Sequence, residues 1–118
     1  MLPKYLKSSR LASVLKPIVV KLGKMPISAL FRRDVDTNLY PTYLNVVSQP
    51  MSLQRIQAKI DANQYLEEQQ FIDDLQLIVN NSIAFNGINS PITANANSIF
   101  LAGFDFLKKM SAEGKEET

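Results

Sequence analysis

The residues best suited to chemistry gather around one asparagine, in the stretch SIAFNGINSPIT at residues 82–93. An apolar helical run arrives at Phe85 and stops at Asn86-Gly87, and we expect a second helix to begin at Pro91-Ile92. An asparagine side chain offers two N–H donors and one carbonyl acceptor, which suits a neutral ligand that carries an amide. Taken alone, however, Asn-Gly is a common helix-ending pair, and the pair by itself favours that structural interpretation.

The composition offers few groups for catalysis. Histidine and cysteine are both absent, which removes the usual general base, the thiol nucleophile and the commonest metal ligands. The acid pairs Glu67-Glu68 and Asp73-Asp74 are adjacent, so on a helix their side chains point about 100° apart and cannot share a substrate. We interpret these acids as solvent-facing. With no motif of a hydrolase, phosphate-binding loop or metal cluster, the sequence predicts no enzyme, no cofactor and no metal site.

Basic side chains dominate the first third of the chain. The net charge is only +2, but every Asp and Glu lies at or after Asp34, so the lysines and arginines of residues 1–33 have no acid among them. A solvated basic helix face is the favoured interpretation, and contact with a nucleic-acid backbone is the alternative. The patch has no interleaved exposed aromatics and no Gly-rich phosphate cradle, so direct nucleic-acid binding is expected to be weak or absent.

Four segments with helical periodicity must position these residues. They are expected around residues 11–22, 52–62 and 67–85, and from residue 91 onward. Pro17 predicts a kink in the first helix, because it lacks the amide that would bond one turn back, and Gly23 is a plausible end. Ser52 and Ser90 are candidate N-caps, and Gly103 should let a neighbouring helix approach closely. We expect one domain over residues 1–112 and a polar tail over 113–118.

Residues 24–50 connect the first two helices without a sustained period. A loop this long is uncommon inside a domain and is usually functional or disordered. This one is rich in apolar and aromatic side chains, so we expect it to be ordered and packed as a candidate binding wall. In an antiparallel bundle it lies at the same end as Asn86, so the loop, Phe85 and Ile92 can ring a pocket. The predicted fold is all-α, a four-helix bundle with a long loop between its first and second helices.

Two stretches carry a resemblance to a known family. YPTYLNVVSQPMSLQRIQAKI, at residues 40–60, contains Pro-x-Tyr and Pro-Met-x-Leu, and FIDDLQLIVNNSIAFN, at residues 71–86, ends in Phe-Asn. In this order and spacing the chain resembles the bromodomain family over roughly residues 5–110. The resemblance implies a left-handed four-helix bundle with a long first loop, which agrees with the periodicity.

The resemblance also implies a function, the binding of acetylated lysine. Asn86 falls on the asparagine that donates to the acetyl carbonyl, Tyr43 on the tyrosine that reaches this carbonyl through a water, and Val35 on a residue that packs against the acetyl group. Ile92 falls on the gatekeeper position. The other implied site residues are Phe31, Leu39, Tyr40 and Phe85. Asn81 corresponds to an asparagine that ties down loop backbone, whereas Pro50 and Met51 match structural positions.

The chain departs from the family pattern near the pocket. Ala29-Leu30-Phe31 replaces a Trp-Pro-Phe shelf, which removes a large apolar wall, and Phe85 and Leu44 stand where tyrosines are common. Arg32 and Arg33 lie beside the shelf and could repel a basic peptide. These departures motivate an alternative function, a bromodomain-like scaffold that binds a protein partner without recognising acetyl-lysine and has an occluded or misshapen pocket.

By resemblance, the expected partners are acetylated histone tails or other acetylated proteins, together with subunits of chromatin complexes, and the expected location is the nucleus. The module would act as a reader in chromatin and transcription regulation. No apolar run is long enough to span a bilayer, so no membrane partner is expected. Single-site binding should be weak, because association costs consume much of what one hydrogen bond and one buried side chain supply.

Overall fold

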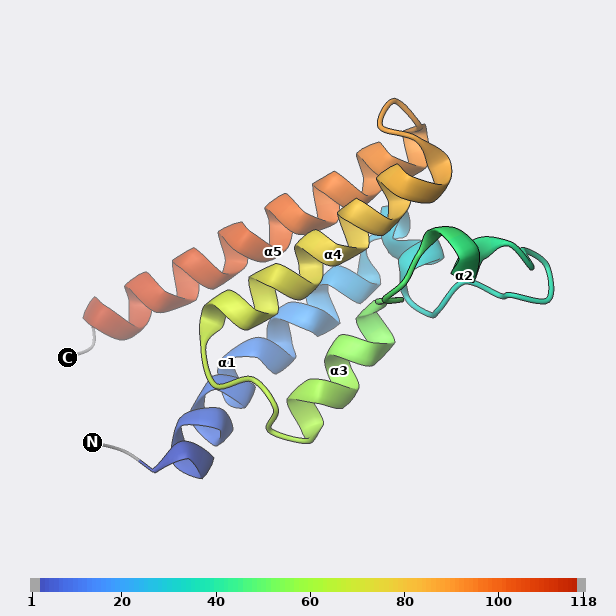
Figure 1. The fold of residues 1–118 in the computed structure, drawn as a ribbon. Coiled ribbons are helices and arrows are strands. Elements are labelled where there is room, and N and C mark those ends of the chain that lie inside the picture. The colour runs from blue at the N-terminus through green and yellow to red at the C-terminus, as the bar shows by residue number, and fades with distance from the viewer. Residues whose placement is uncertain (1–2, 117–118) are drawn as a thin grey trace.

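The computed structural model describes residues 3–116, and the side chains of residues 3–110. Its elements are α1 (Lys4–Lys24), the 3₁₀ helix η1 (Pro26–Phe31), α2 (Tyr43–Val46), α3 (Leu53–Asp61), α4 (Glu68–Asn86) and α5 (Pro91–Glu116). The four longer helices α1, α3, α4 and α5 form a bundle, and the loop between α1 and α3 projects from one of its ends (Figure 1). The predicted all-α four-helix bundle with a long first loop is therefore confirmed, and residues 3–116 contain no strand.

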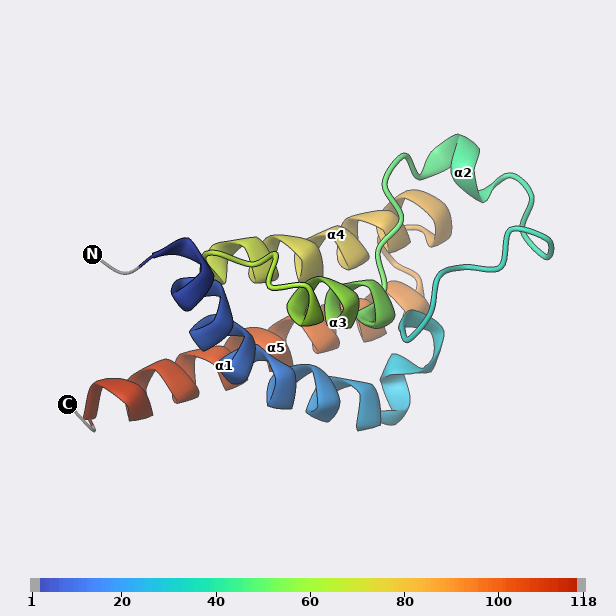
Figure 2. The same cartoon turned by 90° about the horizontal axis from the view of Figure 1, so that it is seen from below.

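Helix α1 is continuous through its proline but is not straight. Its first turns run at an angle to the rest of the helix (Figure 2), as expected where Pro17 cannot donate a backbone bond to the preceding turn. Gly23 lies inside the helix, so the prediction that it ends the helix is wrong. The helix continues to Lys24, and the backbone N–H of Met25 donates to the carbonyl of Leu22.

The side chain of Arg32 explains this later helix end. Its Nε lies 2.7 Å from the carbonyl oxygen of Gly23, and its terminal nitrogen lies 3.1 Å from that of Met25. A cation that donates to the last carbonyls of a helix satisfies acceptors that have no partner within the helix. Arg32 is thus engaged with the end of α1.

Side chains fix the starts of helices α3, α4 and α5. Ser52 Oγ accepts from the amide of Arg55 at 3.1 Å, and Ser90 Oγ accepts from the amide of Ile92 at 3.1 Å, which confirms both predicted caps. Glu67 forms a capping box at the start of α4. These caps set where α3, α4 and α5 begin, and so fix the position of the turn that follows Asn86.

The core fills the space between the four long helices. Among its fully buried side chains are Leu15, Ile18, Ile56, Phe71 and Ile99. Helix α5 approaches α4 and α1 closely at Gly103, where a Cβ would lie 2.5 Å from Leu75 Cδ1 and 3.3 Å from Leu22 Cδ1. The expected close approach at this glycine is confirmed.

The long loop contains short helices that the sequence did not predict. The 3₁₀ helix η1 and the single-turn helix α2 both fall inside the stretch expected to be irregular. The loop is tied to the bundle on both sides, because Asn81 Nδ2 on α4 donates to the Gln49 carbonyl at 2.9 Å and the Gln54 amide donates to the Arg32 carbonyl at 3.0 Å. This order supports its predicted role as a packed wall.

The prediction that the paired acids all face the solvent is wrong for Asp74. Asp73 is exposed, but Asp74 is buried, where its Oδ2 accepts from the Tyr65 hydroxyl at 2.5 Å and from Lys59 Nζ at 2.6 Å. The two partners supply the donors that a buried carboxylate needs. Burial, followed by the hydrogen bond to Asp74, raises the pKa of Tyr65 well above its ordinary value, so the phenol remains a donor.

The described part of α5 extends to Glu116, into the stretch expected to be a tail, while residues 117 and 118 lie outside the described residues. The domain boundary near residue 112 stays a prediction. None of the helices within residues 3–116 has the length and apolar character that crossing a membrane would demand.

Candidate functional site

Two cavities with a shared wall lie at the loop end of the bundle. The wider has a volume of about 370 Å³ and the narrower about 30 Å³. Both are lined by Leu30, Phe31, Val35 and Asn86. The wider one is also lined by Ala29, Asp34, Asp36, Leu39, Tyr40, Phe85 and Ile92, and the narrower one by Arg33, Tyr43, Met51, Ile78, Asn81 and Ser82. All eight predicted site residues therefore line one or both cavities.

Asn86 is the last residue of α4 and the polar residue common to both cavities. Its Nδ2 lies 3.2 Å from Ser82 Oγ, one helical turn earlier. The helix ends directly after it, because Gly87 takes φ +97° and ψ 152°, a region of backbone space that is essentially restricted to glycine. Asn86 thus serves as a helix end and also presents an amide to the cavities, so the two interpretations of Asn-Gly are compatible.

Aromatic rings join the loop to α4 beside Asn86. The ring of Phe85 meets the edge of Tyr43 with centroids 4.9 Å apart, and that of Tyr40 with centroids 5.8 Å apart. Such edge-to-face contacts are a favourable arrangement of aromatic pairs. Tyr43 is buried, and this burial, with a smaller effect of the Asp34 charge, raises the pKa of its phenol. The Tyr43 hydroxyl therefore remains a neutral donor at physiological pH.

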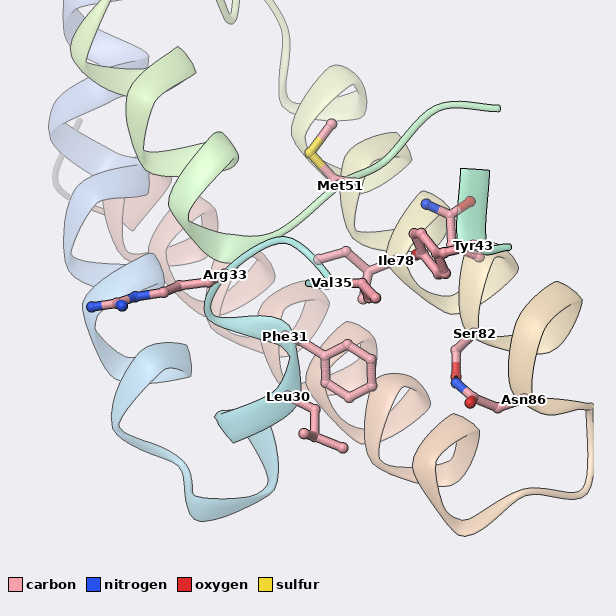
Figure 3. Close-up of a pocket in the computed structure, with 10 residues that line it drawn as sticks. Leu30, Phe31, Arg33, Val35, Tyr43, Met51, Ile78, Ser82 and Asn86 are labelled. Atoms are coloured by element: carbon pink, nitrogen blue, oxygen red, sulfur yellow. The ribbon is translucent and has the colours of Figure 1, made fainter. Parts of the chain in front are cut away.

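The opposite wall comes from η1 and the residues that follow it. Figure 3 shows Phe31 and Val35 across from Ser82 and Asn86, whereas the side chain of Arg33 points away from all four. Phe31 and Val35 are half-buried. The guanidinium of Arg33 is therefore directed away from the polar end of the site (Figure 3), and the repulsion of a basic peptide by the two arginines stays a prediction.

Among the described lining residues, those of the wider cavity include carboxylates and those of the narrower cavity do not. Asp34 is paired with Arg55, whose terminal nitrogen lies 2.6 Å from its Oδ2, and the hydrogen bonds from Arg55 lower the pKa of Asp34. Asp36 Oδ1 accepts from the backbone amide of Asn38 at 2.9 Å. The described lining of the narrower cavity includes no carboxylate, so a cation entering it would meet no opposite charge.

Sequence reasoning missed two hydroxyl residues behind Asn86. Neither Ser82 nor Thr93 was singled out from the sequence, yet their hydroxyl oxygens lie 2.9 Å apart in a buried contact between α4 and α5. A polar serine inside an apolar stripe, one turn before Asn86, was the available signal. Met51, expected to be structural, and Ile78 also line the narrower cavity.

No group of three or more metal-ligating side chains occurs in the part of the chain that the structure describes. The chemistry available at the site is therefore that of the residues already named. It consists of an amide and hydroxyl groups at the inner end, with apolar and aromatic walls around them. This arrangement can accept a neutral polar group at the end of an apolar stem.

Comparison with known proteins decides the family. The sequence profile described as Bromodomain matches residues 15–98, which include all eight predicted site residues. The chain belongs to the bromodomain family. The wider cavity of this bromodomain is open, and the alternative scaffold function stays a hypothesis.

Relatives of this bromodomain bear names from transcription and chromatin. It is 35% identical over 97 residues to Transcription initiation factor TFIID subunit 1 of Drosophila melanogaster, covering 82% of this chain and 5% of that protein. The same subunit of Caenorhabditis elegans is 35% identical over 94 residues, which cover 79% of this chain and 5% of that protein. Chromatin structure-remodeling complex subunit rsc1 of Schizosaccharomyces pombe is 34% identical over 85 residues, which cover 72% of this chain and 10% of that protein. The match thus spans a small part of each relative.

Proposed function

We propose that this bromodomain binds acetylated lysine, on histone tails or other acetylated proteins, as a chromatin reader module that works in the nucleus. The names of its relatives, a transcription initiation factor and a chromatin-remodelling subunit, support the setting. Subunits of such complexes are the further partners we propose. The cavity volume of about 370 Å³ is in the range of small-ligand sites.

The observation that carries the proposal is the remaining hydrogen-bonding capacity of Asn86. Among the described residues, Ser82 Oγ is the only acceptor for its amide nitrogen, so the second N–H is available to a ligand. The surrounding walls come from Phe31, Val35 and Phe85, which suit the lysine stem and the acetyl methyl. An acetyl carbonyl would receive the second N–H of Asn86.

A water is proposed to connect the same carbonyl to Tyr43. The narrower cavity of about 30 Å³ is large enough for roughly one or two waters and has the polar partners that a buried water needs, in Tyr43, Asn81 and Ser82. Because the Tyr43 phenol stays neutral, it can donate to such a water. Tyr43 would then take part without touching the ligand directly.

Discrimination against unmodified lysine follows from charge. An ammonium beside Asn86 would lose its hydration, which costs several kcal/mol. The carboxylates of the wider cavity do not fully offset this cost, because Asp34 is paired with Arg55 and Asp36 accepts from the Asn38 amide. Acetylation removes the charge and adds an acceptor, which contributes about 0.5–1.5 kcal/mol through the hydrogen bond. Burial of the methyl group and stem adds ~2 kcal/mol. Much of this sum is offset by the cost of association, so we expect weak single-site binding that a second module or mark would strengthen.

Titration of the ¹⁵N-labelled protein with paired acetylated and unacetylated histone peptides tests the proposal. We expect resonances near Asn86 to shift only with the acetylated peptide, and Asn86→Ala to remove the response while the helical circular dichroism stays unchanged. Asn80→Ala is the matched control, because Asn80 is an exposed asparagine of the same helix. Equal responses to both peptides, or loss of binding in both variants, would contradict acetyl-lysine recognition through Asn86.

A further inference from the structure

Asn86 is connected to a chain of hydrogen bonds that crosses from α4 to α5. Asn86 Nδ2 lies 3.2 Å from Ser82 Oγ, which lies 2.9 Å from Thr93 Oγ1, which in turn lies 2.7 Å from the carbonyl oxygen of Gly87. Ser82 and Thr93 are 4% and 2% exposed, so bulk water does not compete for these hydroxyls. Figure 3 shows the Asn86 amide directed at Ser82.

The direction of every proton in this chain is determined by its last member. A carbonyl oxygen can only accept, so the single hydroxyl proton of Thr93 is donated to Gly87. Thr93 Oγ1 must then accept from Ser82, whose only proton is thereby used. Ser82 Oγ is left as an acceptor, and it can pair only with the N–H side of the Asn86 amide.

The opposite orientation of the amide is disfavoured. If Asn86 were rotated by 180° about its last side-chain bond, its carbonyl oxygen would face the lone pairs of Ser82 Oγ, in a partly buried contact with no proton between them. The Gly87 carbonyl, the last member of the chain of hydrogen bonds, is itself held in place, because it also accepts from the Ser90 amide at 3.2 Å. The network therefore selects one of the two amide orientations.

We propose that Ser82 and Thr93 are positioning residues that hold the Asn86 amide nitrogen toward the ligand, so that the site is specific for a ligand acceptor. This inference deepens the proposed acetyl-lysine function and rests on it. Thr93 lines neither cavity, so its effect on binding would be transmitted through Ser82. A ligand carbonyl gains from an amide that is already oriented, because no orientational freedom is lost on binding.

Two substitutions of Thr93 separate its hydroxyl from its packing. Thr93→Val keeps the shape and removes the hydroxyl, whereas Thr93→Ser keeps the hydroxyl and removes a methyl. We expect Thr93→Val to weaken acetyl-lysine peptide binding by about two- to tenfold, and Thr93→Ser to stay close to the unmodified protein. Ser82→Ala provides a second variant with the same expected loss. Equal losses in Thr93→Val and Thr93→Ser, or no loss in Thr93→Val, would overturn the proposal.

A readout without ligand distinguishes failure of this inference from failure of the proposed function. The side-chain ¹⁵N–¹H₂ resonances of Asn86, identified by their disappearance in Asn86→Ala, should shift in ligand-free Thr93→Val and Ser82→Ala but not in Thr93→Ser. Should the unmodified protein bind no acetylated peptide, the proposed function fails, and these resonances still test the chain of hydroxyls. Unchanged Asn86 resonances in Thr93→Val would reject the positioning role whatever the peptide result.

Discussion

At the scale of single residues, Asp74 depends on side chains from outside its own helix. Tyr65 precedes α4, and Lys59 comes from α3, and both donate to the same carboxylate oxygen. Lys59 also lies over the Tyr65 ring, 4.8 Å from its centroid. The three side chains thus connect α3, the turn after it and α4 through one buried charge.

We expect Asp74→Ala to lower the free energy of unfolding by roughly 1–3 kcal/mol, because the Tyr65 hydroxyl would stay buried without its acceptor. Asp73→Ala is the matched control, since Asp73 is exposed and its Oδ1 accepts from Gln69 Nε2, one turn earlier. Urea denaturation of both variants measures the difference. Equal losses would show that the buried contacts of Asp74 contribute nothing measurable.

The neighbouring acids also show what one sequence can predict about single residues. Asp73 and Asp74 are identical in type and adjacent, and the sequence alone does not show that Tyr65 and Lys59 lie beside Asp74 in space. Asn86, by contrast, was predicted as a site residue from its place between apolar neighbours and from a family resemblance. Local pattern and resemblance therefore selected Asn86, while the environment of Asp74 depended on contacts between elements.

At the scale of elements, helix packing is tightest where α5 passes α4 and α1. Gly103→Ala should destabilise the protein by about 1–3 kcal/mol relative to Gly23→Ala, because its Cβ would lie 2.5 Å from Leu75 Cδ1. Gly23 is also helical, and no atom lies within 4 Å of an added Cβ, so its substitution gives the gain in helix propensity alone. Thermal unfolding of both variants tests this, and an equal rise in the two melting temperatures would contradict it.

The sequence predicted the long helices better than the short ones for a physical reason. A helix such as α4, with 19 residues, repeats its apolar stripe over several turns, and Ser52 and Ser90 mark helix starts by their chemistry. The helices η1 and α2 have 6 and 4 residues, too few for a period to appear. The end of α1 was misplaced because it depends on Arg32, which lies beyond the helix.

At the scale of the whole molecule, the site forms at one end of an elongated bundle that measures 48 × 24 × 20 Å. The cavity walls come from η1, the long loop, α4 and the start of α5, which are brought together by bonds such as that between Asn81 and Gln49, 32 residues apart. A local sequence pattern contains no information on such contacts, and this one was expected only because the family resemblance implies that Asn81 ties down loop backbone. The cavity volumes and the hydroxyl chain behind Asn86 could therefore not be predicted from the sequence.

The response of the entire fold to pH should be unusually simple. The chain has no histidine and no cysteine, so no side chain with an ordinary pKa titrates between about pH 5 and pH 8, and we expect the free energy of unfolding to be nearly constant there. Asp34 has its pKa lowered from 3.8 by Arg55. Its stabilising contribution is complete above the unfolded pKa and is lost as the pH falls through the lower folded value.

Asp34→Asn tests this sign. The variant should be less stable than the unmodified protein at pH 7, and the difference should shrink below about pH 4, as the folded carboxyl becomes protonated. Urea denaturation from pH 2.5 to pH 8 measures both effects. A difference that stays constant down to the lowest pH would contradict the assigned role of the Arg55 pair.

The backbone of Gly87 has a consequence for how this domain tolerates change. Gly87 lines neither cavity, yet its left-handed conformation aims the carbonyl on which the orientation of the ligand-facing amide depends. In a library of all single substitutions, selected for capture of acetylated peptide, variants at this position should be depleted nearly as strongly as those at Asn86. A surface glycine without a side chain would then rank among the residues on which recognition depends most.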